Sequence, residues 1–101
     1  MYRFTRYATL QNAVFVPQAI GWSTELCGYI NKTYKIPLKV GVELFGNLNI
    51  HWEFELDSLD KMSELNTKLL SDKAYVQMLE KGKDFWVTGS VKDQIVNFLT
   101  P

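Results

Sequence analysis

The chain has very few of the side chains that most often hold metals or act as nucleophiles. Its 101 residues include one cysteine, Cys27, and one histidine, His51. A single cysteine allows no internal disulfide and no cysteine-based metal site, because both need at least two thiols. Cys27 also lies on an apolar helical stripe, which favours a small core residue over a nucleophile. We therefore predict neither a metal nor a cofactor.

The sequence also lacks an excess of either charge and a long apolar run. It has 11 basic and 11 acidic residues, and the basic ones are scattered, whereas phosphate-backbone binding needs a concentrated cationic face. The longest uncharged apolar-leaning segment, residues 10–24, contains Pro17, Gly21 and several amides and cannot cross a membrane. The N-terminus has no hydrophobic block typical of a signal peptide. We expect a soluble cytoplasmic protein with no nucleic-acid or membrane partner.

Apolar and aromatic side chains, by contrast, are abundant. They make up 47% and 14% of the chain, respectively. A chain of this length is expected to form one domain, so residues 1–101 should share a single core. The aromatic content is high for so short a chain. It indicates either a second buried surface, such as a dimer interface, or a cavity lined by aromatic rings.

The order of periodic segments predicts an α+β fold. Strand patterns cover residues 2–10, 38–45, 50–56 and 91–99. Helical patterns cover residues 17–34 and the region from 58 to 86, with a break at residues 71–73. Two right-handed β-α-β crossovers interleaved in this βαββαβ order give a ferredoxin-like antiparallel sheet of order 4-1-3-2. Its helices lie on one face.

The third predicted strand assigns residues to the two faces of this sheet. Ile50, Trp52, Phe54 and Leu56 point one way, towards the helices, and His51 points the other way. The far face should also carry the following side chains: Glu43, Phe45, Glu53, Glu55, either Arg3 or Arg6, and either Phe98 or Leu99. Large aromatic side chains mixed with opposite charges suit a dimer interface better than open solvent. We therefore expect a two-fold homodimer that packs sheet against sheet.

Three segments resemble a known family. They are Gly46-Asn-Leu-Asn-Ile-His-Trp-Glu-Phe, Leu69-Leu-Ser-Asp-Lys-Ala-Tyr and Phe85-Trp-Val-Thr-Gly-Ser-Val-Lys-Asp. Together with the βαββαβ order they are similar to dimeric α/β-barrel proteins, and more narrowly to uncharacterised bacterial members of that superfamily. The resemblance covers essentially the whole chain. It implies a dimeric barrel whose small-molecule pocket lies between the sheet and the helices, and it leaves the activity unassigned.

The resemblance also implies a set of candidate pocket residues under the helices. Trp22, Trp52, Phe54 and Trp86 are predicted to bind a ligand, and Asn66 and Tyr75 are candidate catalytic residues. Cys27 and Tyr29 are possible further lining residues. The same side chains could instead fill an ordinary hydrophobic core. Gly21 and Gly28 leave a similar choice, because glycine on a helix permits either close packing against the sheet or room for a ligand.

His51 is the third candidate catalytic residue, because histidine is the side-chain type suited to proton transfer near neutral pH. It could act as a proton shuttle beside Glu53 or Glu43, or it could be a hydrogen-bonded interface residue. The superfamily that the chain resembles includes haem-degrading monooxygenases, which bind the haem iron through a histidine on a helix. Neither helical region here contains histidine, so this activity would need a tyrosine as the iron ligand instead.

Three functions follow from these features. The leading expectation is a small-molecule-binding homodimer with an apolar, aromatic-lined pocket. The first alternative is a cofactor-independent monooxygenase or cyclase acting on an aromatic substrate. The second is a structural or regulatory dimer whose core is filled.

Overall fold

A computed structural model describes residues 1–43 and 45–100. The elements follow one another as β1 (Tyr2–Thr9), α1 (Val16–Tyr34), β2 (Lys39–Val42), β3 (Asn49–Leu56), α2 (Leu59–Leu70), α3 (Lys73–Gly82) and β4 (Lys92–Asn97). Short 3-10 turns occupy Ala13–Phe15 and Lys83–Phe85. The four strands form one sheet of order β2-β3-β1-β4, with antiparallel pairing throughout. This is the predicted order read in reverse, so the ferredoxin-like α+β fold is confirmed.

Local sequence explains where the helices begin and end. Pro17 lies in the first turn of α1, where a missing N–H is tolerated. Lys35 ends α1 in the left-handed region with φ 58°. Ser58 accepts hydrogen bonds from the backbone amides of Asp60 and Lys61 and so caps α2. Asp72 accepts one from the amide of Tyr75, which starts α3 and explains the break between the two helices.

The strand register fixes which side chains share a face. β1 lies between β3 and β4, and Arg6 is directly opposite Trp52 on one side and Asp93 on the other. Side chains at directly opposed positions project from the same face. Arg6 therefore lies on the face that carries Trp52, and Tyr7 lies on the face that carries His51.

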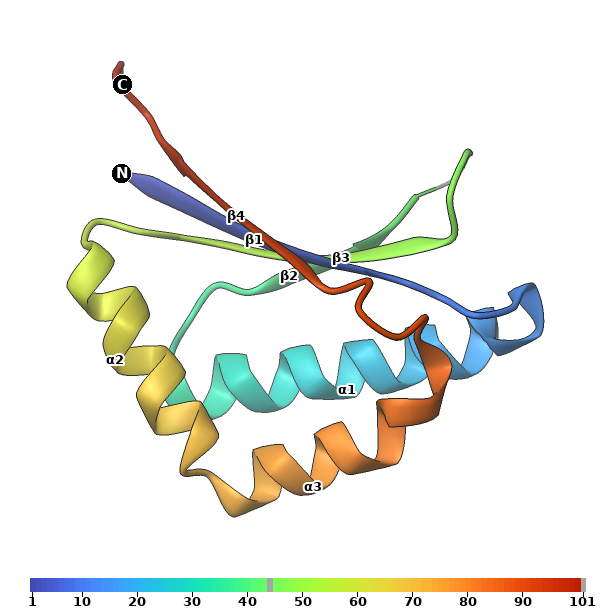
Figure 1. The fold of residues 1–101 in the computed structure, drawn as a ribbon. Helices are drawn as coiled ribbons and strands as arrows, with labels where there is room; N and C mark the ends of the chain where they lie inside the picture. The colour runs from blue at the N-terminus through green and yellow to red at the C-terminus, as the bar shows by residue number, and fades with distance from the viewer. Residues whose placement is uncertain (44, 101) are drawn as a thin grey trace.

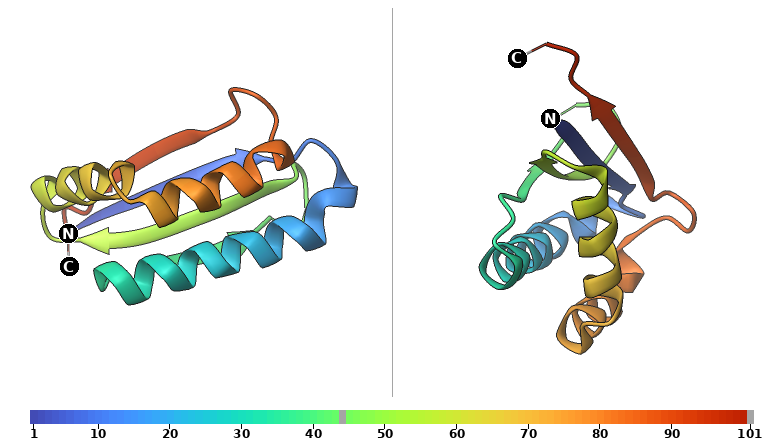
Figure 2. Two further views of the ribbon diagram at one scale, coloured as in Figure 1. Left: turned by 90° about the horizontal axis from the view of Figure 1, so that it is seen from below. Right: turned by 90° about the vertical axis from the view of Figure 1, so that its left-hand side faces the viewer.

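All three helices lie on one side of the sheet (Figure 1). α1 covers the side of the sheet formed by β2 and β3, and its buried face consists of Ala19, Ser23, Leu26, Cys27 and Ile30. Two views at right angles show that β4 lies at the opposite margin, away from α1 (Figure 2). The exposed side chains of Asp93 and Ile95 belong to this margin.

Two predicted strands are shorter in the structure than in the sequence pattern. β2 ends at Val42, and the predicted continuation to Phe45 runs through Leu44, which lies outside the described residues. β4 covers residues 92–97 instead of 91–99. Edge strands pair on one side only, so their ends have fewer partners than those of the central strands β1 and β3.

Both expectations for Gly21 and Gly28 are wrong. Each glycine is exposed on α1, and a Cβ built there meets nothing within 4 Å. They therefore neither bring the helix close to the sheet nor line a cavity. The glycine that does permit close packing is Gly82, where a Cβ would lie 2.7 and 2.8 Å from two carbons of the Trp22 indole.

Candidate functional site

A cleft with two adjoining lobes lies between the helices and the sheet. The first, which we call the tryptophan lobe, measures about 300 Å³ and is lined by Trp22, Trp52 and Trp86 together with Ala8 and aliphatic side chains of α1. The second, the outer lobe, measures about 470 Å³ and is lined by residues of α2 and β4. Six residues line both lobes: Phe4, Arg6, Phe54, Leu65, Leu69 and Tyr75. The two lobes are therefore adjoining parts of one cleft.

Aromatic rings in mutual contact form one wall of the tryptophan lobe. The ring centroids of Trp52 and Trp86 lie 5.4 Å apart, and that of Trp22 lies 5.8 Å from Trp86 and 6.4 Å from Trp52. Trp22 Nε1 donates to the carbonyl of Met78 at 2.7 Å, which ties α1 to α3 and fixes the indole. Such tilted and edge-to-face arrangements are the favoured geometries of aromatic pairs. The three indoles thus form a rigid apolar surface.

A polar cluster of Arg6, Asp93 and Tyr75 lies in the cleft, and we call it the polar group. Arg6 Nε donates to Asp93 Oδ1 at 2.7 Å, and Arg6 Nη2 donates to Oδ2 at 2.9 Å. This bidentate pair joins β1 to β4, and the guanidinium also lies 5.7 Å from the ring centroid of Phe4. Arg6 and Tyr75 line both lobes, and Asp93 lines the outer one. The polar group therefore stands where the lobes meet.

Burial and neighbouring charge set the protonation of this group. Burial raises the pKa of the Tyr75 hydroxyl above its ordinary value, although the Arg6 guanidinium opposes the shift. The hydrogen bonds to Asp93 raise the pKa of Arg6, while burial lowers it. At neutral pH Tyr75 is a protonated hydrogen-bond donor and Arg6 is charged. The cleft thus offers two donors beside an apolar wall.

All four predicted ligand-binding residues and one predicted catalytic residue, Tyr75, meet in this cleft. Trp22, Trp52, Phe54, Trp86 and Tyr75 all line the tryptophan lobe. Asn66 lies on an exposed part of α2 and lines only the outer lobe, away from the indoles. No side-chain hydrogen bond of Asn66 is found among the described residues.

Two other proposed lining residues have structural roles instead. The Cys27 thiol donates to the carbonyl of Leu38 at 3.0 Å and is buried, as expected for a core residue. The Tyr29 hydroxyl donates to Asp72 Oδ2 at 2.6 Å, and Tyr34 donates to the same oxygen at 2.5 Å. The two tyrosines therefore connect α1 to the cap of α3.

The sequence did not identify Arg6 and Asp93 as residues of the site. Arg6 is two residues from both Phe4 and Ala8 on β1, so the three side chains share one face, and this spacing could have placed Arg6 under the helices once the register was known. Asp93 is 87 positions away from Arg6, and only the pairing of β1 with β4 brings the two together. The alternation along the first strand alone left open whether Arg3 or Arg6 faced the helices.

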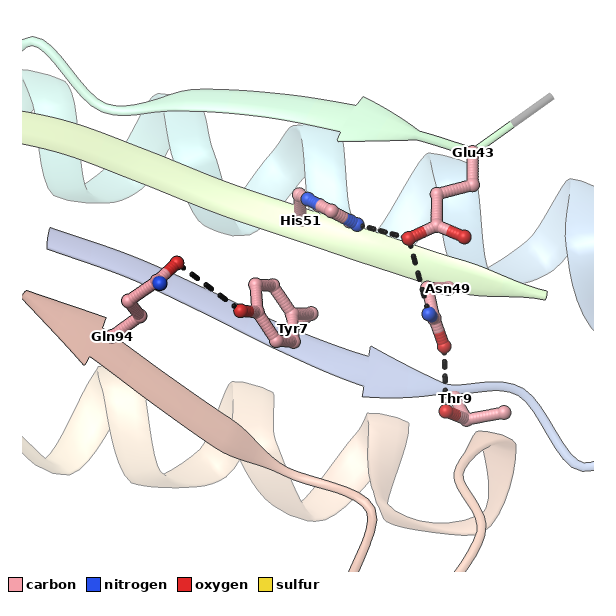
Figure 3. Close-up of polar contacts among 6 residues, drawn as sticks. All are labelled: Tyr7, Thr9, Glu43, Asn49, His51 and Gln94. Atoms are coloured by element: carbon pink, nitrogen blue, oxygen red, sulfur yellow. Dashed lines mark hydrogen bonds and ion pairs between the residues drawn. The ribbon is translucent and has the colours of Figure 1, made fainter. Parts of the chain in front are cut away.

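The far face of the sheet carries a separate polar network around His51 (Figure 3). Glu43 Oε1 lies 2.7 Å from His51 Nε2 and accepts a hydrogen bond from Asn49 Nδ2 at 3.1 Å. Asn49 Oδ1 in turn accepts from the Thr9 hydroxyl at 2.6 Å. Hydrogen bonds from Asn49 and His51 hold the pKa of Glu43 below its ordinary value. His51 therefore lies apart from Asn66 and Tyr75, on the face away from the helices, as the alternation along the third strand predicted.

Aromatic side chains extend this far face on either side of the network. The Tyr7 ring lies 4.8 Å from the His51 ring, and the Tyr7 hydroxyl donates to Gln94 Oε1 at 3.3 Å. Arg3 lies over the Phe98 ring at 5.2 Å. Of the paired alternatives left open by the sequence, Arg3 and Phe98 are the ones on this face.

Two further features are absent from residues 1–43 and 45–100. Within these ranges no three His, Cys, Asp or Glu side chains come together in a way that could hold a metal ion. No helix there is both long enough and apolar enough to cross a membrane.

Comparison with known proteins identifies relatives by fold alone. No protein-family model matches the chain, and a search of curated proteins finds no match. Among solved structures, a NIPSNAP family protein of unknown function from Agrobacterium tumefaciens is similar with a TM-score of 0.81 at 20% identity, over 95% of this chain and 86% of that one. An uncharacterised NIPSNAP domain protein from Burkholderia xenovorans gives 0.82 at 13% identity, over 100% and 99%.

A second group of similar structures carries a different description. A provisionally assigned antibiotic biosynthesis monooxygenase from Deinococcus radiodurans has a TM-score of 0.73 at 13% identity, over 100% of this chain and 95% of that one. At such identities the likeness establishes the shared ferredoxin-like fold and nothing about activity. The neighbours are thus bacterial proteins of the kind that the sequence resemblance indicated.

Proposed function

We propose that this chain is a small-molecule-binding protein that takes an apolar or aromatic ligand in the cleft between helices and sheet. The observation that carries the proposal is the tryptophan lobe itself. Its volume of about 300 Å³ lies at the lower end of the range of about 300–1,000 Å³ typical of small-molecule sites. An apolar wall with a few convergent polar groups is the usual composition of such sites.

The arrangement of the lining supports a flat ligand. Trp22, Trp52 and Trp86 present indole faces and edges, against which an aromatic ring can pack in the geometries that rings prefer. Arg6 and Tyr75 stand at one end of the lobe and can orient a ligand by hydrogen bonding.

A pair of substitutions on α3 tests where the ligand binds. Leu79 lines the tryptophan lobe, whereas Val76 lines neither lobe, and both side chains are exposed on the same helix. Leu79→Trp places an indole in the mouth of the lobe and reduces the apolar space that is left for a ligand. Binding of naphthalene should therefore weaken by about fivefold or more. Val76→Trp should leave the affinity unchanged. Calorimetric titration measures both, and equal effects would place the ligand elsewhere.

The proposal includes a homodimer that packs the far faces of two sheets together. No described helix covers that face (Figure 1), and Tyr7, Val96 and Phe98 add apolar area around the His51 network. A mixed aromatic and polar surface of this kind fits a protein interface. In this proposal His51 and Glu43 act as interface residues, and residues 1–101 form one domain of a cytoplasmic protein.

A second candidate function is cofactor-independent oxygenation of a phenolic ligand. The observation that favours it is the position of Tyr75 and Arg6 beside an apolar cavity, where they could bind an oxygen atom of the substrate. The test is oxygen uptake by the protein with naphthols as substrates. Uptake that exceeds the buffer rate and falls in Tyr75→Phe would favour the enzyme. Binding of the naphthol without oxygen uptake would favour a binding protein that has no oxygenase activity.

A further inference from the structure

The polar group of the cleft and the neighbouring Trp52 hold more hydrogen-bond donors than acceptors. Asp93 occupies Nε and Nη2 of Arg6, and no hydrogen bond from Nη1 is found among the described residues. The Arg6 guanidinium interacts with the Tyr75 hydroxyl oxygen, and the hydroxyl hydrogen is left to be donated in the protonated form that burial favours. Trp52, directly opposite Arg6 on β3, has a buried Nε1 without a partner in the part of the chain that the structure describes. Such a surplus of donors suits a ligand that brings an oxygen acceptor.

The charge of this group is nevertheless balanced. Asp93 neutralises Arg6 through the bidentate pair, so a ligand that approaches the guanidinium also approaches a carboxylate. Lys83 also lines the tryptophan lobe, and it is paired with Glu80 at 2.5 Å. A carboxylate ligand would lose its hydration and gain little net attraction in return. An uncharged carbonyl oxygen could accept from the same donors without repulsion from Asp93.

We propose that Asp93 is the residue that sets the ligand specificity of the cleft, and that it makes the cleft select uncharged aromatic carbonyl compounds over aromatic carboxylates. The aromatic body lies against the indoles of the tryptophan lobe, and the carbonyl oxygen accepts hydrogen bonds from Arg6 and Tyr75. This inference rests on the proposed function, because it requires that the cleft binds a small molecule. It adds the ligand class and a residue that determines it.

The test compares three ligands that share one ring system. Naphthalene measures binding by the aromatic body, methyl naphthyl ketone adds an uncharged acceptor, and naphthoate adds a charged one. Calorimetric titration gives each affinity for the wild-type protein, for Asp93→Asn and for Tyr75→Phe. Asp60→Asn is the control, because Asp60 is an exposed carboxylate of α2 that lines neither lobe.

Two ratios of affinities are compared between the variants and the wild-type protein: ketone to naphthoate, and ketone to naphthalene. In Asp93→Asn the preference for ketone over naphthoate should fall by about threefold to fivefold, since Asp93 is partly exposed and such charge effects are modest. In Tyr75→Phe the preference for ketone over naphthalene should fall by about threefold or more through loss of a donor. Both ratios should stay at their wild-type values in Asp60→Asn. Thermal unfolding of each variant checks that the fold is intact.

The outcomes separate this inference from the proposed function. If the wild-type protein binds naphthalene but the ketone–naphthoate preference is unchanged in Asp93→Asn, the specificity inference is wrong and the binding function stands. If the preference changes equally in Asp60→Asn, a general effect of net charge replaces the role of Asp93. If none of the three ligands binds, the proposed function itself fails. Should Asp93→Asn not fold, the ketone–naphthalene ratio in Tyr75→Phe still decides whether the acceptor is recognised.

Discussion

At the residue scale, single positions in this chain have roles that their residue type does not reveal. Three glycines lie on helices, yet only Gly82 is in contact with a neighbouring element, where it packs under the Trp22 indole. Gly21 and Gly28 face open space. Spacing along α1 could place these two on one side of the helix but could not say whether anything lies opposite them. The contact of Gly82 depends on the relative placement of α1 and α3.

Alanine at two of these glycines should change stability in opposite directions. Gly82→Ala puts a methyl group less than 3.0 Å from several carbons of the fixed Trp22 indole, so we expect the free energy of unfolding to fall by about 1–3 kcal/mol. Gly28→Ala adds a methyl group in open space on a helix, where alanine is favoured by up to about 1 kcal/mol. Urea denaturation measures both. A Gly82→Ala protein as stable as the wild type would mean that Trp22 does not pack there.

At the scale of elements, Asp72 connects two helices that the sequence pattern treats as separate. Its carboxylate caps α3 and accepts the hydroxyls of Tyr29 and Tyr34 from α1. The break at residues 71–73 was predictable from the residues themselves. The contact with the two tyrosines was not, because Tyr29 could equally have faced the cavity.

The pKa shifts of this contact make stability depend on pH. Hydrogen bonds from Tyr29 and then Tyr34 hold the pKa of Asp72 below its ordinary value. Because the folded-state value is the lower one, the contribution of Asp72 to stability is complete above the unfolded pKa of about 4 and is lost as pH falls through the folded value. We expect Asp72→Asn to be less stable than the wild type at neutral pH, with a difference that shrinks in acid.

Denaturation at neutral and acid pH tests this sign, with Asp60→Asn as the comparison. Asp60 lies in the first turn of α2 and contacts neither tyrosine through any hydrogen bond of the described residues. A difference between Asp72→Asn and wild type that grows in acid would contradict the assignment. The same contact raises the pKa of Tyr34 to about 12, so absorbance titration should find a lower tyrosine pKa in Asp72→Asn.

At the scale of the whole molecule, much of the architecture follows from the sequence. The alternation of Ile50, Trp52 and Phe54 with His51 assigned both faces of the sheet correctly. The site was only partly predictable from the sequence. Its aromatic wall could be predicted, because the aromatic residues recur at helical and strand spacing. The Arg6–Asp93 pair could not be predicted, because the two residues come from opposite ends of the chain and meet only through the pairing of β1 with β4. Alternation along a strand assigns side chains to faces of the sheet, whereas only the register between strands shows which charged residues lie side by side.

The proposed homodimer can be tested with two neighbouring residues of β4 that point to opposite faces. Val96 is opposite Arg3 on the far face, and Ile95 is opposite Phe4 on the helix-covered face. Val96→Arg should dissociate the dimer, because it adds a charge to an interface core. Ile95→Arg should leave it assembled. Sedimentation velocity at micromolar concentration measures both, and a monomeric wild-type protein would rule out the dimer.

The tryptophans report directly on whether the cleft binds an aromatic small molecule. All three tryptophans of the chain line the same lobe, so the indole N–H signals in a two-dimensional NMR spectrum come only from the walls of the proposed site. Titration with methyl naphthyl ketone should shift all three signals in a saturable manner with one common affinity. Backbone signals that change while the three indole signals stay fixed would mean that the ligand binds outside this cleft.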